Sequence, residues 1–155
     1  MSINYRVLEK TDEPLLLAFF EGLSRETRQK RFLTDIFPGW IIGRILNTEY
    51  TLAAMETVSG AERIVGMGNI CAENCPLAEI ALVISDENQR QGIGVHLARE
   101  LAEYAKARGC LGFSADISAG NEQALNFLKK FGESNNARIF KSSFKNILQI
   151  NLYFQ

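Results

Sequence analysis

Two consecutive stretches decide the fold: Ala78-Glu79-Ile80-Ala81-Leu82-Val83-Ile84-Ser85 and Gln89-Arg90-Gln91-Gly92-Ile93-Gly94. Residues 78–85 are apolar at both alternating sets of positions except Glu79, which is typical of a central strand covered on both faces. Residues 92–108 place Ile93, Leu97 and Leu101 four apart, a spacing that predicts a helix with one buried face. The two stretches therefore predict a strand, a short loop and a long helix.

The loop between this strand and helix has the chemistry of an anion site. The first-turn amides of a helix lack intrahelical acceptors, and the helix dipole adds positive potential there. Gly92 and Gly94 leave those amides uncovered, and Arg90 adds a cation. Gly94 is followed by Val95-His96, which excludes a Walker loop. Leu97 stands where a Rossmann fingerprint needs its third glycine. Glycine at such a turn can also serve packing alone, so an anion site and a purely structural turn both remain possible interpretations of this loop.

The other elements follow from apolar periodicity and turn signals. Ahead of the central unit we predict a strand, a buried helix, a basic helix capped by Ser24, a helical turn and two strands, at residues 4–8, 15–20, 25–31, 40–46, 50–57 and 63–72. After it we predict a strand, a helix closed by Gly132 and a terminal hairpin, at residues 111–117, 121–131, 137–140 and 147–152. Gly109 should end the long helix. This order predicts a single α/β domain with a mixed sheet and helices on its faces.

Composition limits the classes of partner. The 155 residues carry 17 Lys and Arg against 18 Asp and Glu, so no overall field recruits nucleic acid or an anionic membrane. No apolar run approaches the roughly 20 residues of a membrane span. Residues 1–6 lack the features of a signal peptide. We therefore expect a cytoplasmic protein with no nucleic acid and no membrane among its partners.

Three cysteines, Cys71, Cys75 and Cys110, are an odd number in a chain without an export signal. This predicts reduced thiols rather than a disulfide. No metal is expected, because a zinc site needs about four soft ligands and the only histidine, His96, lies in another element.

The last five residues, Asn151-Leu152-Tyr153-Phe154-Gln155, look like a remnant of a protease site used to remove purification tags, although Ile150 stands where the full site has Glu. We therefore predict one domain over residues 1–150, with 151–155 outside it.

The loop also resembles a known family signature. Gln89-x-x-Gly92-x-Gly94 is similar to the Q/R-x-x-G-x-G/A acyl-CoA pyrophosphate motif of the GNAT N-acetyltransferase superfamily, and Asn121-x-x-Ala124 resembles its second cofactor segment. The resemblance covers residues 4–150 and implies a mixed, mostly antiparallel central sheet with helices on both faces. It implies acetyl-CoA (coenzyme A) as co-substrate, without a metal. The cofactor contacts that it implies are Leu82, Val83, Ile84, Gln89, Arg90, Gln91, Gly92, Ile93, Gly94, Val95, Asn121, Ala124 and Phe127.

A narrower resemblance is to bacterial Pat-type protein lysine acetyltransferases. The stretch from Phe19 to Phe32 is similar to their F-F-x-x-L-S-x-x-S-R-x-x-R-F opening, and two shorter segments sit in comparable places, Val65-Gly66-Met67-Gly68 and Ala78-Glu79-Ile80-Ala81. This implies an amine acceptor that is a protein lysine. Pat-type enzymes usually carry a further domain, for which this chain has no room.

The reaction that the resemblance implies needs a base, because a lysine-like ammonium with a pKa near 10.4 must first lose a proton. Glu79 is the candidate, as the carboxylate of the A-E-x-A segment, and burial in the strand would raise its pKa. The alternative is a structural ion pair with an arginine. By resemblance, the amides of Val83 and Ile84 would stabilise the oxyanion. Leu128 stands where many members have a tyrosine that protonates the thiolate.

Several interpretations stay open. The basic cluster on residues 25–31 (Arg25, Arg28, Lys30, Arg31) is either a solvated face or a site for an acidic partner or for a phosphate of CoA. His96 should lie on the polar side of its helix. Alternative functions are a small-amine acetyltransferase acting on a polyamine or antibiotic, and a weakly catalytic acyl-CoA-sensing module, which Leu128 motivates. The sequence fixes neither the acceptor nor the choice between monomer and homodimer.

Overall fold

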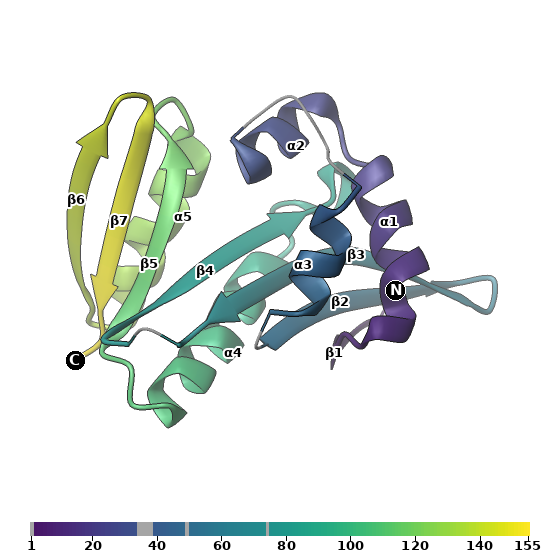
Figure 1. Ribbon diagram of the computed structural model, residues 1–155, viewed down its shortest axis with the longest axis horizontal. Coiled ribbons are helices and arrows are strands. Elements are labelled where there is room, and N and C mark those ends of the chain that lie inside the picture. The colour runs from purple at the N-terminus through teal and green to yellow at the C-terminus, as the bar shows by residue number, and fades with distance from the viewer. Residues whose placement is uncertain (1, 34–38, 49, 74) are drawn as a thin grey trace.

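A computed structural model describes residues 2–33, 39–48, 50–73 and 75–155 of the chain. Its elements are shown in Figure 1. In chain order they are β1 (Ile3–Val7), η1 (Lys10–Asp12), α1 (Glu13–Glu21), α2 (Arg25–Phe32), α3 (Ile41–Leu46), β2 (Tyr50–Val58), β3 (Ala61–Cys71), β4 (Leu77–Ile84), η2 (Asp86–Asn88), α4 (Ile93–Ala107), β5 (Gly112–Ser118), α5 (Glu122–Ser134), β6 (Arg138–Phe144) and β7 (Ile147–Tyr153).

The strands form one mixed sheet in the order β1-β2-β3-β4-β5-β7-β6. Only β4 and β5 run parallel, and the other neighbours are antiparallel. Helices α1 to α3 lie on one face and α4 and α5 on the other (Figure 1). The mixed, mostly antiparallel sheet with helices on both faces confirms the predicted fold class.

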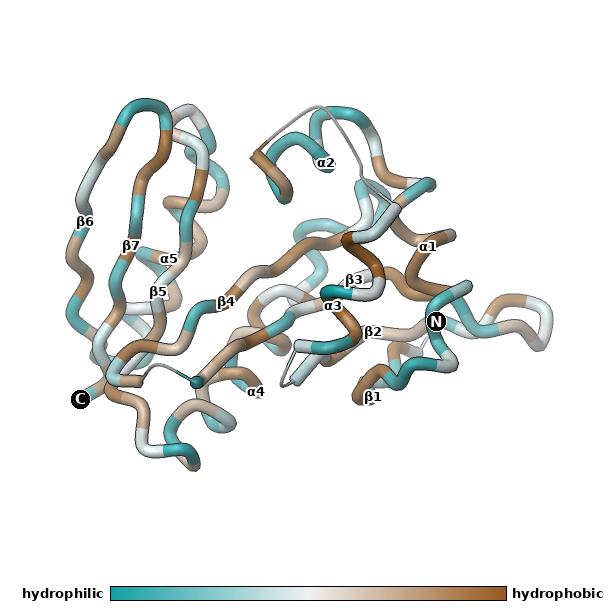
Figure 2. The backbone as a smooth tube through the Cα atoms, in the orientation of Figure 1, coloured by the Kyte–Doolittle hydropathy of each residue, from teal (hydrophilic) through white to brown (hydrophobic). Residues whose placement is uncertain are grey.

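Strand β4 divides its side chains between the two helical layers because alternate residues of a strand point to opposite faces. Ile80 packs in one buried cluster with Leu101 of α4. Val83 packs in another with Phe19 and Phe20 of α1. The apolar path of β4 through the middle of the molecule is visible in Figure 2. Burial on both faces explains why this strand was readable from its composition.

Most predicted ends are confirmed. The Ser24 hydroxyl accepts from the N–H of Thr27 at 3.1 Å, and Gly109 follows α4 with a φ of +79°. The predicted end of α5 at residue 131 is wrong. The helix continues to Ser134, and Gly132 is buried within its last turn because a Cβ there would stand 2.7 Å from Ile139 Cδ1. Strand β6 also extends beyond the predicted residue 140, to Phe144.

The domain does not end at residue 150. Strand β7 runs through Tyr153, and Leu152 is 1% exposed in the core. Beyond the strand, the N–H of Phe154 donates to the carbonyl of Leu111 at 2.8 Å, and the Phe154 ring lies 5.1 Å from that of Phe113. The residues that resemble a protease site therefore complete a central strand. The alternation of apolar side chains in residues 148–152 was the signal for this.

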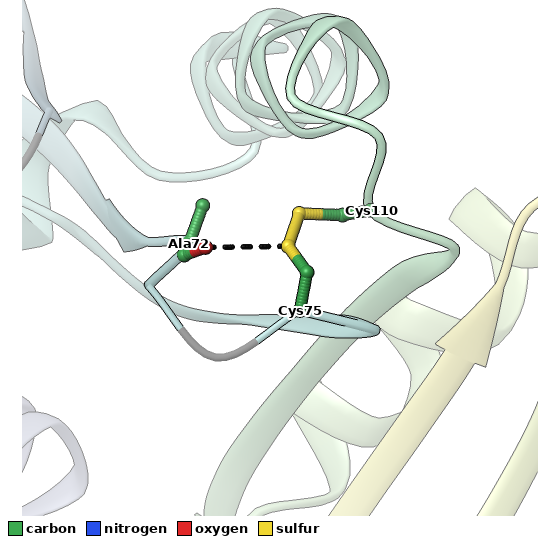
Figure 3. Close-up of a disulfide and its surroundings, with 3 residues drawn as sticks. All are labelled: Ala72, Cys75 and Cys110. Carbon is green, nitrogen blue, oxygen red and sulfur yellow. Dashed lines mark hydrogen bonds between the residues drawn. A yellow bond between two sulfur atoms is a disulfide. The ribbon is translucent and has the colours of Figure 1, made fainter.

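The expectation of three reduced cysteines is also corrected. Cys75, in the turn before β4, forms a disulfide with Cys110, which precedes β5, across a sequence separation of 35 residues (Figure 3). Parallel pairing brings the starts of β4 and β5 together, and the sequence alone does not show this proximity. Cys71 remains a free, half-buried thiol.

Two expectations concern absent features. Among the described residues, no cluster of three or more His, Cys, Asp or Glu could hold a metal ion. Within the same ranges, every helix is too short or too polar to cross a membrane.

Candidate functional site

The site lies where the two parallel strands separate. β4 pairs with β5 only over Leu77–Glu79, opposite Gly112, Phe113 and Ser114. Beyond Glu79 the strands diverge (Figure 1), so one edge of β4 from Ile80 to Ile84 has no strand beside it. Helix α2 contacts both strands. The divergence gives an extended ligand access to strand backbone in the middle of the sheet.

The open edge presents only alternate residues. The Ser85 N–H donates to the Val65 carbonyl of β3 at 2.8 Å, so two residues earlier Val83 also directs its backbone groups at β3. Leu82 and Ile84 direct theirs toward the open edge. Of the two amides predicted to stabilise an oxyanion, the geometry thus retains Ile84. The side chain of Val83 is core.

The N-terminus of α4 opens at the far end of this edge. Gly92 is its N-cap, with a φ of +85°, and no side chain caps the helix. A Cβ at Gly92 would meet nothing within 4 Å, whereas one at Gly94 would stand 3.4 Å from the Phe127 ring. The first-turn amides of Ile93, Gly94 and Val95 therefore face a surface that a phosphate can approach. The Ile93 side chain is buried, so only the backbone amide of this residue is available to a ligand.

The loop ahead of α4 is held by its own glutamines. Gln89 Nε2 donates to the Ile84 carbonyl at 3.2 Å, and Gln91 Nε2 donates to the Glu87 carbonyl at 3.3 Å. Arg90 is exposed and has a φ of +63°. Gln89 thus fixes the loop against the end of β4, a role that its place in the motif did not reveal.

Helix α5 borders the same loop. Gln123 Nε2 donates to Gln89 Oε1 at 3.4 Å, and Phe127 contacts the position of Gly94. Asn121 is the buried N-cap, and its Oδ1 accepts from the N–H of Ala124 at 3.1 Å. The predicted cofactor segment therefore lies against the loop. The Asn121 side chain already uses its Oδ1 to cap α5.

A carboxylate joins the loop to α2. Asp86 accepts from the Ser24 N–H at 3.0 Å, from the Ser24 hydroxyl at 2.8 Å and from the Thr27 hydroxyl at 2.6 Å. Burial alone would raise the pKa of Asp86, but the hydrogen bonds from Thr27 and Ser24 together lower it below its usual value. Asp86 thus anchors the N-terminus of α2 beside the loop.

Glu79 stands at the point of divergence, opposite Ser114 of β5 and Cys71 of β3. Its side chain is exposed, which corrects the expectation that the strand buries it. The buried cluster of α1 and α3 includes Val83 but not Glu79, so this end of β4 lies outside their cover. A carboxylate here is accessible to an acceptor.

Arg31 of α2 belongs to the basic cluster that the sequence left open between a solvated face and a binding site, and its guanidinium turns toward the sheet. Its Nη2 donates to Asn69 Oδ1 of β3 at 3.1 Å. Burial lowers the pKa of Arg31 to about 10, and the charge of Glu79 opposes that shift. The missed signal was helical spacing, because Arg31 follows Thr27 by four residues and Thr27 faces Asp86.

A comparison with protein families decides the identity. The Acetyltransferase (GNAT) family model matches residues 14–132. The chain belongs to the GNAT acetyltransferases. This GNAT protein is thus an N-acetyltransferase, and acetyl-CoA is the donor used by its family. No curated protein sequence matches the chain.

Solved structures share the fold of this GNAT protein. The GNAT domain of S. lividans PAT has a TM-score of 0.82 at 18% identity, covering 98% of this chain and 90% of that one. The PaiA N-acetyltransferase of Thermoplasma acidophilum in complex with coenzyme A has a TM-score of 0.71 at 19% identity, covering 99% and 100%. Diaminobutyrate acetyltransferase EctA of Paenibacillus lautus has a TM-score of 0.71 at 12% identity, covering 98% and 95%.

Leu128, where many GNAT proteins have a tyrosine, is buried with Ile117 of β5 and Ile150 of β7. It can neither donate nor accept a proton. His96 of this GNAT protein is half-buried, and its ring stacks on Tyr5 at 3.7 Å between centroids. Neither residue offers an acid at the open edge of β4.

Proposed function

We propose that this protein transfers acetyl from acetyl-CoA to a primary amine, the side chain of a protein lysine, by direct attack within a ternary complex. The observation that carries the proposal is the open edge of β4. One end of this edge meets the uncapped N-terminus of α4, and Glu79 stands at the other. Ile84 follows Glu79 by five residues along the strand, which is a distance of about 16 Å.

The donor is held from both ends of that edge. The first-turn amides of Ile93, Gly94 and Val95 bind the pyrophosphate, and Arg90 adds its charge. The outward backbone groups of Leu82 and Ile84 hydrogen-bond the extended pantetheine arm as an added strand would. Among the remaining predicted contacts, Phe127 packs beside the arm near Gly94, while Gln89 and Asn121 fix the loop and helix that hold it.

Glu79 serves as the general base. The acceptor arrives as an ammonium, and its proton passes to the Glu79 carboxylate directly or through one water. The neutral amine then forms a C–N bond to the thioester carbonyl, whose oxygen becomes an oxyanion that accepts from an outward N–H of β4 on the Glu79 side of the pantetheine arm. The exposed position of Glu79 lets the proton leave for solvent after each turnover.

Collapse of the tetrahedral intermediate reforms the carbonyl, breaks the C–S bond and expels the CoA thiolate. No titratable side chain stands at position 128, so solvent protonates the sulfur. A thiol pKa near 8.5, by analogy with cysteine, makes the thiolate a tolerable leaving group.

Two observations support a protein acceptor. The polar side chains of Ser114 and Asn151 lie on the same face of the sheet as Glu79. This face of β5 and β7 is not covered by α4 or α5, which pack on the other side (Figure 1). A folded acceptor could thus approach Glu79 over an open face that carries polar groups and the exposed ring of Phe140. The fold is also shared with the GNAT domain of S. lividans PAT.

The test is release of free CoA from acetyl-CoA with lysine peptides and small amines, for the wild type and Glu79→Gln. We expect Glu79→Gln to retain acetyl-CoA affinity and to lose roughly 10²-fold or more in kcat/KM. Glu103→Gln, on the outer face of α4, is the matched control and should behave as wild type. Unchanged turnover of Glu79→Gln between about pH 6 and pH 9 would exclude Glu79 as the base.

The second candidate is an acyl-CoA-binding module with little chemistry, which Leu128 favours. It predicts tight CoA binding with no CoA release for any amine, so the same assay separates the two.

A further inference from the structure

The row of residues that crosses the sheet through Glu79 defines the floor of the acceptor side. Cys71, Glu79, Ser114 and Asn151 stand opposite one another on β3, β4, β5 and β7. Neighbouring strands lie about 4.8 Å apart, and directly opposed residues share a face. Helix α2 contacts both β4 and β5. A side chain near the end of α2 that points toward β3 and β4 can therefore meet an acceptor beside Glu79.

Arg31 is that side chain. Asn69, which accepts from its Nη2, pairs with Ala81 and is the diagonal neighbour of Glu79 across the β3–β4 ladder. The guanidinium carbon also lies 5.0 Å from the centre of the Phe32 ring. The helix and the strand together hold the cation next to the catalytic carboxylate.

The guanidinium is left incompletely paired. Its Nε is buried and has no hydrogen-bond partner within the described part of the chain. In the same ranges, no nitrogen of Arg31 lies within 4.0 Å of a carboxylate oxygen of Glu79, so the two side chains form no direct ion pair. A desolvated cation without a full set of acceptors is costly, and such groups usually have a ligand or a functional reason. The side chain as a whole is half-buried, so a ligand can approach it.

We propose that Arg31 determines acceptor specificity by binding a carboxylate that the acceptor carries close to its reacting amine. This inference rests on the proposed acetyltransferase function. Arg31 and Glu79 present a cation and an anion side by side without neutralising each other directly. A zwitterionic acceptor complements both charges, with its ammonium at Glu79 and its carboxylate at the guanidinium, which suits planar carboxylates. The carboxylate belongs either to a free amino acid or to an acidic residue flanking a lysine.

The experiment compares matched amines. Propylamine and γ-aminobutyrate differ only in the carboxylate, as do ethylamine and β-alanine. Blocked lysine peptides with a neighbouring Asp or Asn form the second arm. We expect the wild type to favour the carboxylate member of at least one arm by roughly 10- to 100-fold in kcat/KM, through KM. A preference confined to the peptides identifies an acidic flank beside a protein lysine, whereas one confined to the small amines identifies a free amino acid and replaces the protein lysine as the acceptor.

Arg31→Gln should reduce that preference to less than about threefold, while Arg31→Lys should keep part of it as a point charge. Arg28→Gln, three residues earlier on the same Lys/Arg-rich helix, is the matched control and should retain the preference. Binding of acetyl-CoA checks that each variant is folded. If Arg31→Gln does not fold, Arg31→Lys becomes the variant that tests the preference.

Equal turnover with and without the carboxylate in both arms, or a preference that survives in Arg31→Gln, would overturn the role of Arg31 and leave the acetyltransferase intact. Failure of every amine to release CoA from a protein that binds acetyl-CoA would instead overturn the proposed function, and this inference with it.

Discussion

Gly112, the first residue of β5, shows how one missing side chain fixes a strand in place. A Cβ there would stand 1.9 Å from the carbonyl oxygen of Leu152, a backbone atom that cannot swing aside. We expect Gly112→Ala to lower the free energy of unfolding by at least about 2 kcal/mol, because β5 and β7 must move apart. Urea denaturation followed by circular dichroism measures this.

Gly120→Ala is the control for that change, because a Cβ at Gly120 meets nothing within 4 Å. It should alter the free energy of unfolding by less than about 0.5 kcal/mol. Equal unfolding midpoints for the two variants would contradict the close approach of β5 to β7.

Residues whose role is local were predictable from the sequence, and those whose role depends on distant chain were not. Ser24 and Gly109 were read correctly because a cap or a left-handed turn involves only a few neighbouring residues. The exposure of Glu79 depends on where α1 and α3 stop covering β4. The inward position of Arg31 depends on Asn69, which lies 38 residues away.

Among the elements, α2 depends most on a partner outside itself. It has eight residues and no buried side chain, so its own apolar packing is weak and the three hydrogen bonds to Asp86 position it. We expect Asp86→Ala to cost about 1 kcal/mol of unfolding free energy, similar to loss of an N-cap, and to raise KM for the amine because α2 carries Arg31. Steady-state kinetics and thermal unfolding measure the two effects.

The contribution of Asp86 should depend on pH. Its pKa is lower in the folded protein than the usual 3.8, so its stabilisation is fully present above that value and is lost as the pH falls through the folded pKa. The stability difference between wild type and Asp86→Asn should therefore be constant near neutral pH and shrink in acid. A difference that grows in acid would contradict the hydrogen bonds to Ser24 and Thr27.

Element boundaries failed where tertiary packing overrides local signals. A glycine in a helical pattern usually marks a terminus, yet Gly132 lies inside α5 because Ile139 of the following strand occupies the space of its missing side chain. The extension of β6 to Phe144 was hidden for a similar reason. Its side chains are mostly exposed, so the strand has no apolar alternation to read.

At the scale of the whole molecule, the disulfide between Cys75 and Cys110 joins the starts of the two parallel strands. It closes a loop that contains β4, the glycine-containing loop at residues 89–94 and α4. We expect Cys75→Ser to lower the free energy of unfolding by about 3–4 kcal/mol through greater entropy of the unfolded chain. This corresponds to a melting temperature roughly 10 °C lower, measured by calorimetry.

Cys71→Ser is the matched control and should melt close to the wild type, because that thiol is free. Added reductant should lower the melting temperature of the wild type and of Cys71→Ser, and leave Cys75→Ser unchanged. A wild type insensitive to reductant would indicate that the disulfide does not form.

The overall fold was accessible from the sequence because one buried strand, one glycine loop and one amphipathic helix specify a strand–loop–helix unit that the family signature extends to a whole domain. The closing half of the sheet was less accessible. Strand β7 inserts between β5 and β6, so its residues are core through contacts that are separated widely in sequence, and its last residues resemble a protease site.

The row that crosses the sheet at Glu79 draws Cys71, Ser114, Asn151 and Phe140 from four strands besides β4. The proposed acceptor surface is therefore encoded in segments scattered over more than half of the chain, whereas the proposed donor loop is encoded in one continuous stretch. A lineage can exchange one segment of that surface and acquire a new acceptor without disturbing acetyl-CoA. This asymmetry explains why a short linear motif can identify the donor, and why none can identify the acceptor.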